Sequence, residues 1–283
     1  MDGQTVVVTG ATSGIGQAAA LNLAKQGARI VFVARSVAKA EAMLGNLKQA
    51  NPDAAHDWVQ ADLATIGAMQ AAGAALAAKA PRIDVLVNNA GAIFDHREIT
   101  ADGLEMTFAV NHMAYFVITE ALRPNLNPTG ARIVSTSSVG HQFGKLDFND
   151  LQSAHGYSAM GAYGRSKLCN IIWTRELARR LGGTGVTANC FHPGGVSTGF
   201  GANTTGAIKL LVGLASRFMI TPAQGADTLI WLASAPEVAG RTGGYWFKRK
   251  LTEPSAAARD PVAGAKLWVG SERIAARASA VTA

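Results

Sequence analysis

A tyrosine and a lysine four residues apart are the side chains in this sequence best suited to proton transfer. Tyr163 and Lys167 lie in a stretch with helical periodicity, so both point to one face of a helix and can reach one cleft. A free tyrosine titrates at about pH 10, and a nearby ammonium stabilises its phenolate; lowering the pKa by about 3 requires roughly 4 kcal/mol. The spacing alone is common by chance, so the pair gains weight only from other motifs.

A glycine-rich segment at residues 9–16 connects the first β-branched run to the first helical stretch. Glycine permits a sharp turn and lets backbone N–H groups approach a pyrophosphate, whose negative charge the dipole of the following helix favours. A simple connecting turn is the alternative, and the position after the first strand disfavours it. The segment therefore predicts a dinucleotide site with contacts from Gly10, Thr12, Ser13, Gly14, Ile15 and Gly16.

Arg35 stands at the end of the second predicted strand, where selection between NAD and NADP is usually made. An acidic residue at this place accepts from a ribose 2′-hydroxyl, whereas an arginine accommodates a 2′-phosphate. A guanidinium also pairs well with phosphate and can stack on adenine. We therefore expect NADP(H); the alternative is that Arg35 is a solvated cation at a strand end.

These residues must be positioned by strands and helices that alternate along the whole chain. Short runs that are apolar on both faces, separated by helices, are typical of a parallel sheet covered on both sides. We predict strands at 5–9, 29–34, 56–60, 85–88, 132–136, 187–191 and 245–247, and helices at 15–26, 37–49, 66–79, 104–122, 162–181, 223–233 and 261–277. The fold class is α/β, with one doubly wound Rossmann sheet over residues 1–283.

Two segments depart from this alternation. Residues 199–221 are too long for an ordinary connection and are rich in apolar side chains, which suggests a substrate lid, a packing interface or a shallow membrane contact. The chain also has a basic C-terminal extension from about residue 248. A lid of this composition suits a lipophilic substrate, and Phe143, Tyr157, Met160 and Trp246 are candidates to line its pocket.

Composition and charge exclude several classes of protein. With 48% hydrophobic and 16% charged residues in 283, the chain is not disordered. The net charge of +7 brings nucleic acid into consideration, but residues 241–283 hold eight Lys/Arg against three Asp/Glu, so the remainder is nearly neutral. Two cysteines and the lack of a long apolar run or leader predict a cytoplasmic protein without metal site, nucleic-acid partner or stable membrane insertion.

Four motifs in order resemble the short-chain dehydrogenase/reductase family over residues 5 to about 272. The glycine spacing at 10–16 is Gly-x-x-x-Gly-x-Gly, and the later motifs are Asp62-Leu63, Asn88-Asn89-Ala90-Gly91 and Tyr163-x-x-x-Lys167. The resemblance implies that Asp62 and Leu63 contact the adenine ring and that Asn89, Ala90 and Gly91 lie beside the cofactor. Within the family, the pattern of residues 111–116, 192–194 and 267–272 looks like the retinol dehydrogenase and WW-domain-containing oxidoreductase branch.

The resemblance also implies further site residues. A serine at the end of the fifth strand would bond the substrate carbonyl and the tyrosine; Ser137 and Ser138 are both placed for this, and the family pattern favours Ser138. Asn111 corresponds to an asparagine that kinks its helix and holds a water for proton relay from the lysine. The cofactor would be contacted by Tyr163 and Lys167 and, after the sixth strand, by Pro193, Gly194, Val196 and Thr198.

The expected activity is NADP(H)-dependent interconversion of a carbonyl and an alcohol on a lipophilic small molecule, with Tyr163 as the proton donor and acceptor. The alternative is a protein that binds NADP(H) as a sensor without turnover. Family members commonly form dimers or tetramers through helices such as 104–122 and 162–181, so we expect a homodimer or homotetramer.

Overall fold

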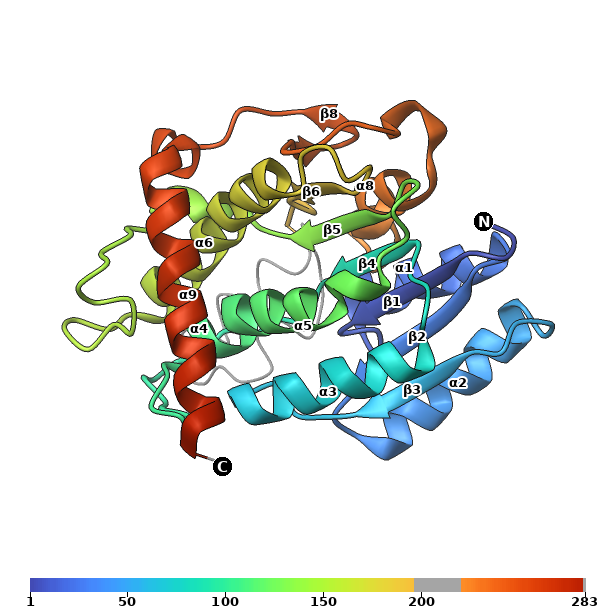
Figure 1. Ribbon diagram of the computed structural model, residues 1–283, viewed down its shortest axis with the longest axis horizontal. Helices are drawn as coiled ribbons and strands as arrows, with labels where there is room; N and C mark the ends of the chain where they lie inside the picture. The colour runs from blue at the N-terminus through green and yellow to red at the C-terminus, as the bar shows by residue number, and fades with distance from the viewer. Residues whose placement is uncertain (196–219, 282–283) are drawn as a thin grey trace.

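Runs of β-branched and apolar residues form a sheet with the strand order β3-β2-β1-β4-β5-β6-β7-β8 (Figure 1). The computed structural model describes residues 1–195 and 220–281. All neighbouring strands pair in parallel except the last pair, β7 and β8. The strands are β1 (Thr5–Thr9), β2 (Arg29–Ala34), β3 (Asp57–Gln60), β4 (Val85–Asn88), β5 (Arg132–Thr136), β6 (Thr187–Phe191), β7 (Tyr245–Phe247) and β8 (Lys250–Leu251). The predicted doubly wound α/β fold is confirmed.

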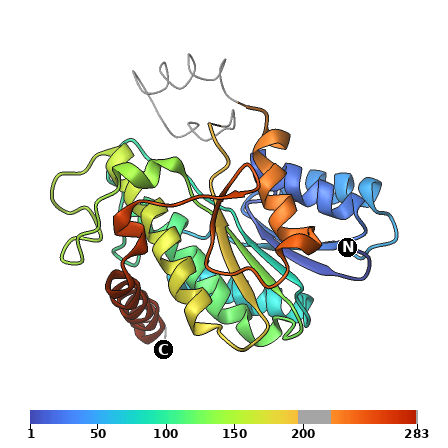
Figure 2. The same ribbon diagram turned by 90° about the horizontal axis from the view of Figure 1, so that it is seen from above.

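Helices cover both faces of this sheet, which Figure 2 shows from above. One layer contains α1 (Gly14–Lys25), α2 (Val37–Ala50) and α8 (Pro222–Ser234). The other contains α3 (Ile66–Lys79), α5 (Ala114–Leu122) and α6 (Ala159–Arg180), with α9 (Pro261–Val281) packed outside against α6 and α3. Short 3-10 helices lie at η2 (Arg123–Asn125), η3 (Val139–Phe143), η6 (Pro236–Val238) and η7 (Ala256–Arg259).

The alternation of side chains along the central strands produces two apolar cores. Val7 and Leu86 point to the layer of α3, α5 and α6, whereas Val6 and Val8 point to α1, α2 and α8. Strand β1 lies between β2 and β4, so the connections on its two sides run in opposite directions. A crevice at the carboxyl ends of the strands at such a switch point is where ligands bind in this fold.

The helix predicted over residues 104–122 is interrupted in the structure. A helical turn α4 (Met106–Phe108) leads into a π-helical turn η1 (Ala109–Met113), and α5 follows. Such turns disrupt the regular hydrogen-bond ladder and frequently occur at functional sites. Asn111 lies in this turn, in agreement with the helix-kinking place that the family resemblance implies.

Tyr245–Phe247 was expected to be the last strand, and this was wrong. A tight turn at Lys248 and Arg249 reverses the chain into β8, and both residues have positive φ, at 49° and 60°. Turns of this kind usually use Asn-Gly or Gly, so the sequence carries no signal for the hairpin. The Asp227 carboxylate pairs with the Arg249 guanidinium, and Thr228 Oγ1 accepts from Arg249 N at 3.2 Å; both contacts hold the turn.

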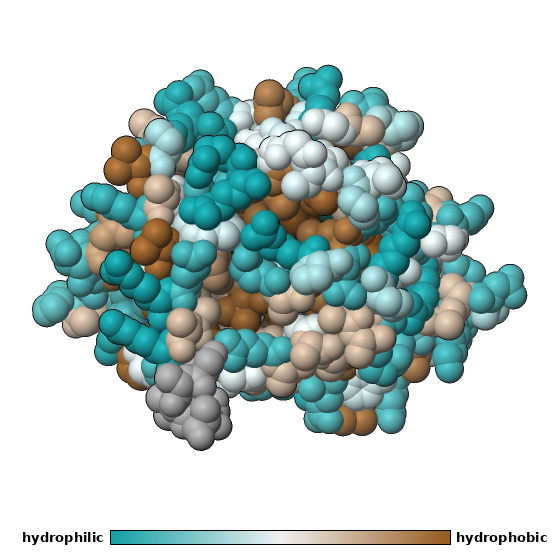
Figure 3. Space-filling view, in the orientation of Figure 1, coloured by the Kyte–Doolittle hydropathy of each residue, from teal (hydrophilic) through white to brown (hydrophobic). Residues whose placement is uncertain are grey.

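The C-terminal helix α9 packs against the main fold. Leu267 and Trp268 of α9 are buried, and the Arg180 guanidinium of α6 lies 4.2 Å from the centroid of the Trp268 ring. On the face that carries α9, hydrophilic side chains predominate and apolar ones show in small groups (Figure 3). Among the helices of residues 1–195 and 220–281, none is long and apolar enough to cross a membrane.

Close packing of α3 against α5 gives a test of the fold. A Cβ atom added at Gly73 would lie 2.5 Å from the Cβ of Ala121, whereas one at Gly45, within α2, meets nothing within 4 Å. We expect Gly73→Ala to lower the free energy of unfolding in urea by about 1–3 kcal/mol. The control Gly45→Ala should raise it by about 0.5–1 kcal/mol because alanine favours helix. Equal effects of the two changes would contradict this packing.

Candidate active site

The glycine-rich segment between β1 and α1 is too tightly packed for a side chain at Gly10 or Gly16. A Cβ at Gly10 would lie 2.8 Å from Ala90 Cα, and one at Gly16 would lie 2.2 Å from Gly10 O. Gly10 and Gly14 also have positive φ, at 72° and 57°. Asn89 Nδ2 donates to Gly10 O at 3.2 Å and to Thr9 O at 3.4 Å, so the end of β4 holds the turn in place. Its backbone therefore faces the crevice directly, as a pyrophosphate site requires.

A cavity of about 350 Å³ adjoins this turn at the carboxyl ends of β1 to β4. It is lined by Gly10, Thr12, Val33, Ala34, Arg35, Ala61, Asp62, Leu63, Ala64, Ala90, Gly91, Ala92, Phe94, Glu98, Met106 and Val110. Seven of the predicted cofactor contacts belong to this lining, namely Gly10, Thr12, Arg35, Asp62, Leu63, Ala90 and Gly91. Ser13 stands at the N-cap position of α1 without a side-chain hydrogen bond to the helix, and Gly14, Ile15 and Gly16 lie within its first turn. The lining residues from Phe94 onward carry no motif, and sequence reasoning missed them.

The residues of this cavity suit a dinucleotide. Glycine backbone lies at one end, and alkyl side chains such as Leu63 can pack against a flat ring. The Arg35 side chain is 79% exposed, and its Nη1 is 3.9 Å from Asp62 Oδ2. Such an exposed ion pair contributes little free energy, so the guanidinium can exchange this partner for a phosphate at small cost.

Tyr163 and Lys167 lie close together and buried on one face of α6, as their spacing predicts. The Tyr163 residue is 8% exposed and Lys167 is 3% exposed. Lys167 Nζ donates to Thr136 O at 3.2 Å and lies 5.7 Å from the ring centroids of both Tyr163 and Tyr115. A Cβ built on Gly91, which lines the cavity, would lie 3.4 Å from the same Nζ. The lysine ammonium thus lies beside the cavity lining at Gly91.

Burial controls the protonation of this pair. Desolvation raises the pKa of Tyr163 to about 12, and the hydrogen bond with Ser138 opposes that rise. Desolvation lowers the pKa of Lys167 to about 7. The lowered tyrosine pKa expected from the sequence is therefore not found in the protein without a ligand, because burial disfavours the charged form of both groups. Positive charge or anionic groups brought in by a ligand are needed to reverse these shifts.

The structure separates the two candidate serines. Ser138, in the turn before η3, forms the hydrogen bond with Tyr163, and its Oγ accepts from Gly140 N at 3.0 Å. Ser137 is buried, and its Oγ donates to Lys167 O at 2.9 Å on the backbone of α6. Ser138 therefore faces the reacting phenol, whereas Ser137 fixes the helix that carries it.

Asn111 is fully buried and holds the end of β4 to α6. Its Oδ1 accepts from Ala92 N at 2.8 Å, and its Nδ2 donates to Ala92 O at 2.9 Å and to Ser166 Oγ at 3.0 Å. Both N–H groups of the amide are used by these bonds, and its Oδ1 keeps one free acceptor position.

The segment after β6 is described only in part. His192 stacks on Phe247 with ring centroids 4.0 Å apart, and its Nδ1 accepts from Gly194 N at 3.2 Å, which fixes the turn at Pro193 and Gly194. Burial lowers the pKa of His192 to about 4. The predicted contacts Val196 and Thr198, and the predicted lid except its last two residues, lie outside the described residues.

Exposed apolar side chains lie near Ser138 and Tyr163 in the sequence. Val139 and Phe143 of η3 follow Ser138 and are 47% and 69% exposed, and Met160, one turn before Tyr163 on α6, is 52% exposed. Trp246 does not join them, contrary to expectation, because it is buried with its ring 5.2 Å from that of Trp231 in the opposite core. Tyr157 OH donates to Phe94 O at 2.7 Å, near the cavity.

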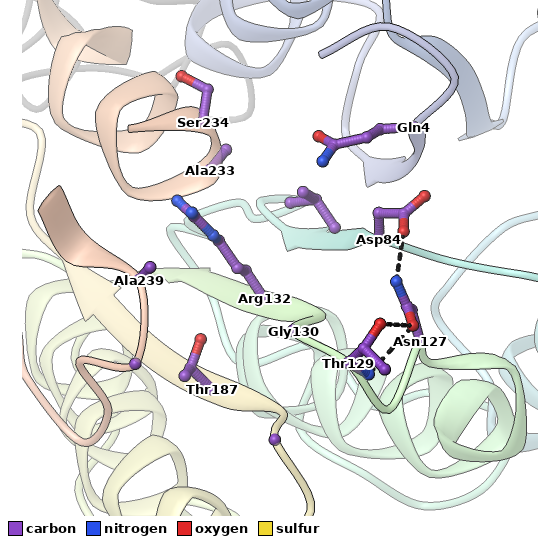
Figure 4. A pocket seen from close by; sticks show the side chains of 13 residues that line it. Gln4, Asp84, Asn127, Thr129, Gly130, Arg132, Thr187, Ala233, Ser234 and Ala239 are labelled. Carbon is purple, nitrogen blue, oxygen red and sulfur yellow. Dashed lines mark hydrogen bonds between the residues drawn. The ribbon is translucent and has the colours of Figure 1, made fainter. Parts of the chain in front are cut away.

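A second cavity, of about 270 Å³, lies at the opposite, amino-terminal ends of the strands (Figure 4). Its charged groups are bonded within the fold: Arg132 Nη1 donates to Ala235 O at 2.7 Å, and Asp84 Oδ1 accepts from Asn127 Nδ2 at 2.8 Å. None of the predicted site residues lines it, so it is not the candidate active site. Across residues 1–195 and 220–281, no group of three or more His, Cys, Asp or Glu side chains is placed to hold a metal ion.

Known proteins are similar in sequence to this chain across nearly its whole length. A family model described as short chain dehydrogenase matches residues 4–208. Retinol dehydrogenase 14 of Mus musculus is 41% identical over 286 residues, covering 96% of this chain and 86% of that protein. "Putative daunorubicin C-13 ketoreductase DnrU" of Streptomyces sp. (strain C5) is 41% identical, covering 96% and 92%. WW domain-containing oxidoreductase of Pongo abelii is 37% identical, covering 96% and 68%.

Solved structures share the fold. An uncharacterized protein from Mycobacterium paratuberculosis has a TM-score of 0.77 at 28% identity, covering 97% of this chain and 94% of that chain. A short chain dehydrogenase from Burkholderia cenocepacia J2315, in complex with NADP, has a TM-score of 0.68 at 28% identity, covering 86% and 95%.

The buried lysine gives a test of the site geometry. Below pH 7 Lys167 is protonated in both folded and unfolded protein, so folding carries the full cost of a buried charge. Between pH 7 and the ordinary lysine pKa of about 10.4, only the unfolded chain keeps the proton, and stability rises with pH. We expect Lys167→Met to raise the free energy of unfolding most at pH 6 and progressively less toward pH 10. A difference that stays constant over this range would contradict the buried ammonium.

Proposed function

This chain belongs to the short-chain dehydrogenase family, in its retinol dehydrogenase-like branch, and on that premise we propose that it is an NADP(H)-dependent oxidoreductase that interconverts a lipophilic carbonyl and its alcohol. The observation that carries the proposal is the place of Lys167 Nζ, which lies beside Gly91 of the cavity lining and 5.7 Å from the centroid of the Tyr163 ring. A nucleotide in the cavity and a substrate at Tyr163 would therefore be neighbours.

Tyr163, Ser138 and Lys167 each have a distinct role in this proposal. When bound, NADP(H) would supply or accept the hydride. Tyr163 donates a proton to the carbonyl oxygen in reduction and accepts one in oxidation. Ser138, already bonded to Tyr163, stabilises the negative charge that develops on that oxygen. Lys167 is protonated more readily when polyanionic groups lie in the adjacent cavity, and its charge then favours the phenolate.

Arg35 supports the choice of NADP(H) over NAD(H). It lies at the end of β2 on the rim of the cavity, its guanidinium is exposed, and Ser36 next to it caps the N-terminus of α2, where a helix dipole favours anions. The first turn of α2 contains no acidic residue that would repel a phosphate. The related structure from Burkholderia cenocepacia contains NADP.

The exposed apolar groups beside the reacting centre support a lipophilic substrate. Val139 follows Ser138 directly, Phe143 ends the same 3-10 helix, and Met160 lies one turn before Tyr163, so the non-reacting part of a substrate would lie against them. Similar proteins are named for retinol and for the ketone of daunorubicin, and both names denote chemistry at a carbonyl or alcohol carbon. Cytoplasmic location and assembly as a homodimer or homotetramer stay predictions.

Removing the phenol should abolish turnover. We expect Tyr163→Phe to lower kcat for reduction of a lipophilic aldehyde by about 100-fold or more, because the proton donor is lost while the ring is retained. The rate is measured by NADPH absorbance, and binding of NADPH by fluorescence titration should change little. The control Tyr245→Phe removes a phenol placed 3.5 Å from His141 Nδ1 and should keep most of the activity. Full activity of Tyr163→Phe would refute the role of Tyr163 as the proton donor.

Arg35 should decide between the two cofactors. In Arg35→Ala, we expect KM for NADPH to rise by about 10-fold or more, the size of a lost charge-assisted contact, while KM for NADH changes little. Arg82→Ala removes an exposed arginine whose partner is Asp84, away from the cavity, and should leave both values unchanged. Preference of the wild type for NADH would refute the role given to Arg35.

A further inference from the structure

Asn170 lies one turn after Lys167 on α6 and connects three parts of the site. It is fully buried, and its Nδ2 donates to Asn111 O at 2.9 Å and to Thr136 O at 3.4 Å. Thr136 O is also the acceptor of Lys167 Nζ. The side-chain amide of Asn170 therefore connects η1, the end of β5 and α6. It shares the carbonyl oxygen of Thr136 as an acceptor with the Lys167 ammonium.

The two carbonyl acceptors determine the orientation of this amide. A carbonyl oxygen cannot donate, so the NH₂ group of Asn170 must face Asn111 O and Thr136 O. Its Oδ1 then faces His112 Nδ1, at 3.4 Å, and can only accept. Nδ1 of His112 must therefore carry a proton.

The other nitrogen of His112 leads to the C-terminal helix. Burial lowers the pKa of His112 to about 4, so the ring is neutral near pH 7 and has one donor and one acceptor. With the proton on Nδ1, Nε2 must accept, and Ser271 Oγ of α9, 3.0 Å away, must donate. The direction of every hydrogen bond from Ser271 through His112 to Asn170 is thus determined.

Packing holds α9 at this point. Trp268, one turn before Ser271, lies with its ring 5.2 Å from that of Phe116 on α5, and its Nε1 donates to Glu272 Oε1 at 2.7 Å. Ser271 is 1% exposed. The C-terminal helix thus presents a buried hydroxyl to the residue that follows Asn111 in the chain.

We propose that Asn170, His112 and Ser271 are positioning residues that hold Lys167 and the Asn111 turn in their reactive arrangement, so that the C-terminal helix is part of the active-site support. The role in turnover rests on the proposed oxidoreductase activity. The hydrogen-bond network itself does not, and the two can be tested separately.

The proton positions are tested by ¹⁵N NMR of the histidine-labelled protein without ligand, with His112→Gln used for assignment. We expect His112 to be protonated at Nδ1 and not at Nε2 between pH 6 and 8. His56 is an internal reference of the opposite kind, because its Nδ1 accepts from Ile30 N at 3.0 Å and its Nε2 donates to Asn51 O at 3.1 Å. A proton on Nε2 of His112 would overturn the network.

The effect on turnover is tested with the isosteric change Asn170→Leu. It removes the acceptor of His112 Nδ1–H, so the ring proton should move to Nε2 and bond to Ser271. We expect kcat to fall about 10-fold with little change in KM for NADPH, because the cavity is untouched.

The matched control is Asn125→Leu. Asn125 Nδ2 likewise donates to two backbone carbonyls, of Ala77 and Ala80, away from the site. This change should lower thermal stability but leave kcat and the His112 spectrum as in the wild type. Unchanged kcat in Asn170→Leu, or an equal fall in Asn125→Leu, would overturn the positioning role.

Ser271→Ala is a smaller change that serves if Asn170→Leu does not fold. It should lower kcat about threefold while His112 keeps its proton on Nδ1, and the wild-type rate would count against the proposal. A wild type that reduces no carbonyl compound would refute the proposed function. The NMR result would still decide whether the network exists.

Discussion

The burial of the Lys167 ammonium is the constraint on which the rest of the site depends. In water this group would be charged at pH 7, but within the fold desolvation lowers its pKa to about 7. Its Nζ donates to Thr136 O, and the ring centroids of Tyr115 and Tyr163 each lie 5.7 Å from it. Because desolvation disfavours the ammonium of Lys167, anions placed near it would raise its pKa. The free protein therefore holds the tyrosine neutral, and in the proposed mechanism the chemistry becomes favourable when the neighbouring cavity is filled.

Much of the fold follows from local patterns in the sequence. Central strands such as β1 and β4 were predicted to the residue because a buried parallel strand must be apolar on both faces. The glycine turn was also predictable, since no side chain fits at Gly10 or Gly16. The β7–β8 hairpin was not, because Lys248 and Arg249 adopt positive φ without glycine and are held by contacts from α8. Trp246 was misplaced because its aromatic character does not reveal which face of the sheet it covers.

The site itself could be predicted only where neighbours in sequence are neighbours in space. Tyr163 and Lys167 satisfy this through one helical turn. Ser137 and Ser138 differ by one residue and therefore point in different directions, and only the geometry shows that Ser138 reaches the phenol. The bond between His112 and Ser271 joins residues 159 positions apart, so no pattern within one helix reveals it. Tertiary packing, rather than propensity, brings the C-terminal helix to the active site.

The most direct test of the account is the fate of the hydride. Purified protein is incubated with a lipophilic aldehyde and NADPH that carries deuterium at both C4 positions of the nicotinamide ring, and the product alcohol is examined by ¹H NMR and mass spectrometry. If hydride passes from NADPH to the carbonyl carbon, we expect one deuterium on the carbinol carbon of each product molecule, with equimolar oxidation of NADPH. An alcohol formed without deuterium, or no consumption of NADPH with any aldehyde or ketone of a lipophilic panel, would contradict it.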